Sequence, residues 1–184
     1  MKITFWITLV ALGTLSCGFY SMAGSIPPHI RSLAIPLLEN QTAEFGVSED
    51  ITDNLLDKFA EENILSIKEE GKAHSILRGV ILKVEDAPYT YSREEAVSEY
   101  RLTITIDIEW YDVRDEKNLL EKQYSGWGAY GYGSDISSDG VDNDGDGVID
   151  AEDDDEIGDA RTFATKIAVG KIAQDILNDI LTDW

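Results

Sequence analysis

Cysteine and histidine are scarce in this chain of 184 residues, and their scarcity excludes several kinds of protein. A single cysteine cannot form a disulfide within the chain, and no zinc-type spacing appears around it. A serine–histidine–aspartate pattern and a glycine-rich phosphate loop are absent from the sequence as well. The two histidines, His29 and His74, are expected at the surface rather than in a catalytic role. We therefore predict a binding protein and no enzyme.

Positive charge is also in short supply. Lysine and arginine number 15 against 36 aspartates and glutamates, which gives a formal net charge of -21. Residues 134–159 alone carry 12 acidic residues and no basic one, so over half of the imbalance is local. Because an acidic domain repels phosphates, the sequence excludes DNA or RNA as a partner.

Long apolar runs are missing except at the N-terminus, where the run Ile3–Leu12 is shorter than the roughly 20 residues of a membrane span. Lys2, this run and the small residues that follow form an export signal over residues 1–16. Cys17 comes next, and its thiol is the expected site of a covalent lipid such as palmitate. Residues 17–25 then form a tether. The alternative is an ordinary cleaved signal with an incidental cysteine, since Thr14 stands where such signals usually have leucine.

The clearest strand in the sequence covers residues 100–113, where apolar and polar side chains alternate. The segment 119–127 is expected to return as its partner strand after a polar turn. One face of this pair packs on a core, and the other, with Thr103, Thr105 and Asp107, is left partly open. An open sheet face is a place where a partner can dock.

Two amphipathic helices complete the pattern. One begins at the expected N-cap Ser48 and ends near Asn63, and the other covers residues 163–181. Shorter strands are expected at 31–38, 64–67 and 76–84, the first ending near Pro36 and the last with a bulge or close contact at Gly79. Residues 26–184 are thus predicted to form one α+β domain. It is a two-layer sandwich of a mostly antiparallel sheet of four to five strands with two helices on one face.

The acidic segment 134–159 is an insertion in this domain, and it contains the spacing of a calcium loop. Carboxylates alternate along the loop, and Gly147 allows the sharp turn that brings them onto one cation. The expected ligands are the side chains of Asp142, Asp144, Asp146, Asp150 and Asp153 and the carbonyl of Val148. With aspartate at the last position, the affinity is expected to be weak, about 10⁻⁴–10⁻³ M as in extracellular modules. The alternative is a solvated acidic loop without a fixed metal.

Aromatic residues gather just before the insertion, at Trp127, Tyr130 and Tyr132. This cluster either lines a ligand surface or, as we expect, plugs the core at the sheet edge.

Short motifs spread over the mature chain resemble those of the LptE-like lipoproteins of lipopolysaccharide assembly. They are Cys17-Gly-Phe-Tyr20, Gly24-Ser-Ile-Pro-Pro-His-Ile30, Ala34-Ile-Pro36, Glu39-Asn-Gln-Thr42, Ile51-Thr-Asp-Asn-Leu55, Ala73–Gly79, Glu99-Tyr-Arg-Leu102 and Asp175–Trp184. The resemblance implies a lipoprotein anchored in the outer membrane on its periplasmic side. Its partner there is the LptD β-barrel, which it plugs and helps to assemble, and lipopolysaccharide is a possible second ligand. The acidic insertion departs from the family pattern.

Two other classes of function stay open at this point. One is another envelope lipoprotein that acts in secretion or assembly, and the other is a calcium-dependent adhesion module on the cell surface.

Overall fold

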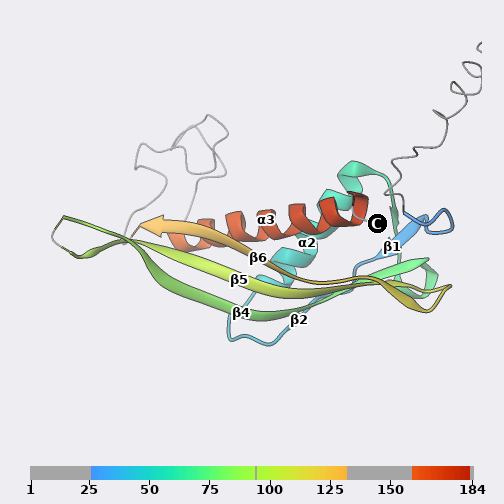
Figure 1. Cartoon of the computed structure of the whole chain (residues 1–184), viewed down its shortest axis with the longest axis horizontal. Coiled ribbons are helices and arrows are strands. Elements are labelled where there is room, and N and C mark those ends of the chain that lie inside the picture. Colours follow the sequence, from blue (N-terminus) through green and yellow to red (C-terminus); the bar gives the residue numbers. More distant parts are fainter. Residues whose placement is uncertain (1–25, 94, 132–158, 183–184) are drawn as a thin grey trace, which may run out of the picture.

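The computed structural model of the chain describes residues 26–93, 95–131 and 159–182. A sheet and two helices account for most of them (Figure 1). In chain order the elements are β1 (Ser32–Ala34), β2 (Glu39–Asn40), α2 (Val47–Glu62), β3 (Ser66–Ile67), the 3-10 helix η1 (Glu70–Lys72), β4 (Ser75–Tyr91), β5 (Val97–Asp112), β6 (Lys117–Gly131) and α3 (Ala160–Thr182). The α+β class predicted from the sequence is confirmed.

The sheet has six strands, so the predicted number of four to five is wrong, and it is mixed, because the short strands add parallel pairs to the predicted antiparallel ones. Its order is β3-β1-β4-β5-β6, and β2 pairs with β4 off this path. The long strands β4, β5 and β6 are antiparallel, whereas β1 runs parallel to β3 and β4, and β2 runs parallel to β4. Helix α2 connects β2 to β3, and this helical crossover is what parallel pairing needs. The predicted first strand, 31–38, is shorter than expected, since β1 ends at Ala34 before Pro36, and β2 lies beyond the predicted range.

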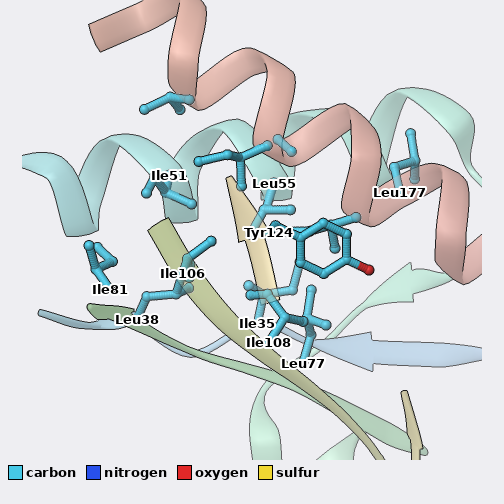
Figure 2. Packing of buried hydrophobic residues seen from close by; sticks show 14 of the residues in the cluster. Ile35, Leu38, Ile51, Leu55, Leu77, Ile81, Ile106, Ile108, Tyr124 and Leu177 are labelled. Atoms are coloured by element: carbon cyan, nitrogen blue, oxygen red, sulfur yellow. The ribbon is translucent and has the colours of Figure 1, made fainter. Parts of the chain in front are cut away.

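Strand β5 confirms the alternation predicted for it. Its inward side chains are almost fully buried: Leu102, Ile104, Ile106, Ile108 and Trp110. Figure 2 shows Ile106 and Ile108 below Ile51 and Leu55 of α2, with Tyr124 of β6 and Leu177 of α3 beside them. Both helices therefore share one apolar core with the sheet, and in Figure 1 both lie on the same side of it.

The start of α2 differs from the prediction. The helix begins at Val47, and Gly46 before it adopts a left-handed φ of 83°, a conformation that glycine takes without strain. Ser48 is therefore a buried residue of the first turn and not the N-cap. Its hydroxyl donates to the carbonyl of Leu38, which ties the helix to the end of the β1–β2 segment.

The expectation of a surface histidine is confirmed for His74, which is exposed, and is wrong for His29. Nε2 of His29 donates to Oδ2 of Asp112 at 2.7 Å, and the side chain of His29 is only 18% exposed. The other oxygen of Asp112 accepts from the backbone N–H groups of Arg114 and Asp115. Although ligand atoms of His29, Asp112 and Asp115 lie within 4.8 Å of one another, these hydrogen bonds account for the cluster as a structural turn.

Gly79 is a point of close packing, which confirms one of the two alternatives predicted for it, a bulge or a close contact. A Cβ there would lie 2.7 Å from Cδ1 of Ile108 and 3.0 Å from Cδ2 of Leu38. The register of β4 shifts further on, first between Ile81 and Lys83.

Candidate interaction surface

The face of the sheet that carries no helix is polar and accessible. Along β5, Arg101 and Asp107 are exposed, while Thr103 and Thr105 are half-buried between their neighbours on β4 and β6. This is the partly open face that the alternation predicted. We refer to it as the outer face.

A glycine–tryptophan–glycine sequence sets the local geometry of β6. Gly126 and Gly128 point inward, where a Cβ would lie 2.3 Å from the carbonyl oxygen of Ala168 and 2.2 Å from that of Ala164. Helix α3 therefore packs directly against the strand backbone. Because side chains alternate along a strand, Trp127 between the two glycines points away from the core. It is 37% exposed.

Trp127 lies at the centre of a cluster of aromatic rings and cations. Its ring centroid lies 5.8 Å from that of Tyr89, 5.6 Å from the guanidinium carbon of Arg101 and 4.8 Å from Nζ of Lys171. Arg101 also lies 5.2 Å from the Tyr89 ring, so one cation contacts both rings. These distances are in the range of cation–π attraction. We call these four residues the Trp127 cluster.

Among the described residues, the two cations of the Trp127 cluster lack a carboxylate partner. Within residues 26–93, 95–131 and 159–182, neither Arg101 nor Lys171 forms an ion pair. This is unexpected in a chain whose acids outnumber its bases by more than two to one. Exposed tryptophan, tyrosine and arginine are also the residue types that dominate binding energy at protein interfaces. The cluster is therefore suited to an anionic or polar partner that also offers a surface for stacking.

The prediction that these aromatic residues plug the core is thus wrong for Trp127 and confirmed for Tyr130. Tyr130 packs against the core, stacks on Tyr100 with ring centroids 5.7 Å apart, and donates a hydrogen bond to Asp86 at 2.8 Å. Tyr132 lies outside the described residues.

Arg161, at the start of α3, links three separate parts of the fold. Its guanidinium binds both carboxylate oxygens of Glu44, at 2.8 and 2.9 Å. It also donates to Oδ2 of Asp86 on β4, at 2.9 and 3.1 Å. Tyr130 of β6 donates to the other oxygen of Asp86. Since Gly131 ends β6 and α3 begins at Ala160, this network fixes both ends of the chain that flank the acidic insertion.

The hydrogen bonds and charges of this network shift the pKa values of three of its residues. The hydrogen bonds from Arg161 lower the pKa of Glu44 below its ordinary value of 4.5, and burial together with the bond to Asp86 raises the pKa of Tyr130 to about 12. The two carboxylates in turn raise the pKa of Arg161. The charged form of Glu44 therefore stabilises the fold above pH 4.5, and this contribution disappears as the pH falls through the lowered pKa.

Replacing Arg161 with alanine is expected to lower the free energy of unfolding by about 1–2 kcal/mol near neutral pH, after allowance for partial exposure. The loss should shrink below pH 4.5, because protonated Glu44 no longer needs the guanidinium. Urea unfolding at about pH 7 and about pH 3 measures both quantities. Arg114→Ala is the matched control, since Arg114 is 63% exposed and pairs only with its neighbour Asp115. A pH-independent loss in the Arg161 variant would contradict the assignment.

The residues predicted from the sequence for lipid and metal lie elsewhere. Cys17 is outside the described residues, and so are all six calcium ligands: Asp142, Asp144, Asp146, Val148, Asp150 and Asp153. The sequence analysis singled out Trp127 but not Tyr89, Arg101 or Lys171, nor the Arg161 network. Tyr89 and Arg101 meet Trp127 through the pairing of β4, β5 and β6, whose register residue patterns alone do not fix. Lys171 and Arg161 reach their partners from α3, and no local pattern records these contacts.

These features together define a class. The fold is an α+β domain with one helix-covered and one accessible sheet face, and its distinguishing surface is an aromatic–cationic cluster rather than a set of groups for chemistry. None of the described helices is both long and apolar enough to cross a membrane.

A family model described as LptE, lipopolysaccharide-assembly, matches residues 30–183. The chain therefore belongs to the LptE family. It is accordingly a lipopolysaccharide-assembly type of lipoprotein of the bacterial cell envelope, from a family that is not enzymatic.

Solved structures are similar to this chain at low sequence identity. A protein from Xanthomonas campestris superposes with a TM-score of 0.54 at 9% identity, over 85% of this chain and 90% of that one. Rare lipoprotein B from Shewanella oneidensis gives 0.46 at 12% identity, over 80% and 92% of the two chains. A minor lipoprotein from Acinetobacter baumannii gives 0.47 at 15% identity, over 84% and 92%. No curated protein matches the chain.

Proposed function

We propose that this chain is an outer-membrane lipoprotein on the periplasmic side that binds, plugs and helps to assemble an LptD-type β-barrel. The barrel then inserts lipopolysaccharide into the outer leaflet. Membership of the LptE family supports a role in lipopolysaccharide assembly. The observation that supports a docking surface is the Trp127 cluster, whose two cations form no ion pair among the described residues.

The chemistry of the outer face suits the inside of a barrel. The interior of an outer-membrane barrel is polar, and its wall offers hydrogen-bonding and charged side chains. The outer face presents Arg101, Thr103, Thr105 and Asp107 in a row along β5. A face of this kind is suited to a polar wall and is unsuited to the acyl chains of a bilayer. The rings of Trp127 and Tyr89 add apolar contact area to this face, at the edge strand β6 where Lys171 of α3 reaches the Trp127 ring.

We also propose that residues 1–16 are removed as a signal peptide, that Cys17 carries the lipid, and that residues 17–25 tether the domain over residues 26–184. The first described residues lie beside β1, at the opposite end of the long axis from the tip of the β4–β5 hairpin (Figure 1). Strand β4 alone has 17 residues, or about 55 Å at 3.3 Å per residue. An anchor at Cys17 therefore leaves the hairpin end, near the Trp127 cluster, free to reach a partner.

Lipopolysaccharide is a second ligand that we propose for the same surface. Its phosphates would be repelled by most of this acidic chain, but Arg101 and Lys171 are two cations without an ion pair among the described residues. The Trp127 cluster is therefore a favourable place for such a contact.

Calcium is proposed as the ligand of the acidic insertion. Twelve acidic residues without a basic one repel each other unless a cation gathers them, and the spacing from Asp142 to Asp153 suits calcium. Calorimetry is expected to show one weak site. The double variant Asp144→Ala/Asp146→Ala should lose this site and keep most of its circular dichroism, because the insertion lies between β6 and α3. Binding that persists undiminished in the double variant would refute the assignment.

Depletion of the protein in cells tests the proposed function. The amount of correctly assembled LptD-type barrel is expected to fall, and the cells should become permeable to large antibiotics because lipopolysaccharide no longer reaches the outer leaflet. Re-expression of the wild-type chain should restore both. Normal barrel assembly after depletion would reject the proposal in favour of another role in the envelope.

A further inference from the structure

A groove on the helix side of the domain is separate from the outer face. It runs between α2 and α3 and encloses about 500 Å³. Val47 and Val169, both buried, belong to its lining. From Val47 to Asp57 the groove follows eleven residues of helix, whose first and last Cα atoms are about 15 Å apart along the axis at 1.5 Å per residue.

The wall formed by α2 is acidic. Asp50, Asp53 and Asp57 lie three and four residues apart, so they share one face of the helix and line the groove. None of the three forms an ion pair within the part of the chain that the structure describes. Of the two basic residues in the lining, Arg161 is already bound to Glu44 and Asp86, which leaves Lys166 alone opposite three carboxylates.

The groove holds more negative than positive charge, and the pKa of Asp50 reflects this imbalance. Burial raises its pKa above the ordinary value of 3.8, and the neighbouring charges of Glu49 and Asp53 raise it further, with only Lys166 acting against them. A cation entering the groove would relieve this repulsion.

An apolar anchor lies on the same surface. Phe45 lines the groove, and its side chain is 98% exposed. Of the large apolar residues that the structure describes as exposed, it is the most accessible. An exposed aromatic ring beside unpaired carboxylates is a surface for a ligand that is both cationic and apolar.

From this groove we propose that the domain has a second docking site, which takes a short basic segment of a protein partner. The segment is extended, about five residues long, and alternates lysine or arginine with apolar side chains. Its cations pair with Asp50 and Asp53, and an apolar side chain packs on Phe45. A segment of five extended residues spans about 16 Å, which matches the length of the groove.

Other occupants fit less well. A phosphorylated membrane surface is repelled by the carboxylates, and a second copy of this chain brings a net charge of -21 with it. A metal ion also fits less well. Among the described residues, the group whose ligand atoms lie within 4.8 Å of one another is His29, Asp112 and Asp115, and none of these residues lines the groove.

The test uses the full chain in EDTA and two fluorescent five-residue peptides, one of alternating lysine and leucine and one of alternating glutamate and leucine. Fluorescence anisotropy is expected to show binding of the basic peptide and none of the acidic peptide. Asp50→Asn/Asp53→Asn should weaken binding about tenfold or more. The matched control Glu61→Gln/Glu62→Gln removes two charges from the exposed end of α2 and should change binding less than twofold.

Phe45→Ser provides a variant that cannot disturb the core, because the ring is almost fully exposed. It should also weaken the basic peptide severalfold. The site is overturned if neither peptide binds, if both bind alike, or if the two double variants weaken binding equally, which would indicate general attraction to an acidic chain. These outcomes are independent of the outer face, so failure here leaves the proposed barrel contact untouched.

Discussion

Gly128→Ala is expected to lower the free energy of unfolding by about 3 kcal/mol, the upper part of the range for overpacked cores. The added Cβ would lie 2.2 Å from the carbonyl oxygen of Ala164 and 2.8 Å from its carbonyl carbon. These are backbone atoms of α3, so no side chain can rotate away, and the whole helix must move off β6. Because α3 supplies much of the core, the cost is spread over many contacts.

Gly170→Ala is the matched control for this prediction. Gly170 lies within the same helix, and a Cβ there meets no atom within 4 Å. Alanine is favoured over glycine in a helix, so this variant should be more stable by about 0.5–1 kcal/mol. Urea unfolding of both variants and the wild type gives the comparison. Equal stability of the two variants would show that α3 does not pack on the backbone of β6 as described.

Cys17→Ser is expected to move the protein from the membrane fraction to the soluble periplasmic fraction. A serine cannot form the thioether to lipid, and several acyl chains give a hold on the membrane that a single chain does not. Ser21→Ala changes the same tether without touching the thiol, and it should leave the protein in the membrane fraction.

Mass spectrometry of the mature wild-type N-terminus identifies the cause of the change in location. The expected first residue is a lipid-modified Cys17. A free thiol at this position, or cleavage elsewhere, would show that the protein reaches the envelope in another way.

The strongest patterns in the sequence located the largest elements correctly. The alternation along residues 100–113 corresponds to β5, and the helical spacing of Ile51, Leu55 and Phe59 corresponds to α2. These patterns are reliable because burial on one face imposes a period of two on a strand and 3.6 on a helix. The close packing at Gly79 was also within reach, since a glycine inside an apolar strand indicates a neighbour that approaches the backbone.

The features that the sequence did not reveal depend on contacts between distant residues. Parallel pairing of β1 with β4 follows from the path of α2, which no local pattern records. Arg161 and Glu44 are separated by 117 positions, and Lys171 meets Trp127 from a different element. Ser48 was mistaken for the N-cap because the preference for serine there is only statistical, whereas the N-cap is Gly46, two residues earlier, with a left-handed φ.

Co-purification in mild detergent tests the proposed contact between the outer face and the barrel most directly. The wild-type chain is expected to bring down an LptD-type β-barrel. Arg101→Glu/Lys171→Glu reverses the charge of the two cations of the Trp127 cluster, which form no ion pair among the described residues, and this variant should no longer bring down the barrel. The control Lys72→Glu/Lys117→Glu reverses the charge of two exposed lysines elsewhere and should still bring it down. Absence of a barrel from the wild-type sample, or equal recovery with the Arg101→Glu/Lys171→Glu variant, would contradict docking through this surface.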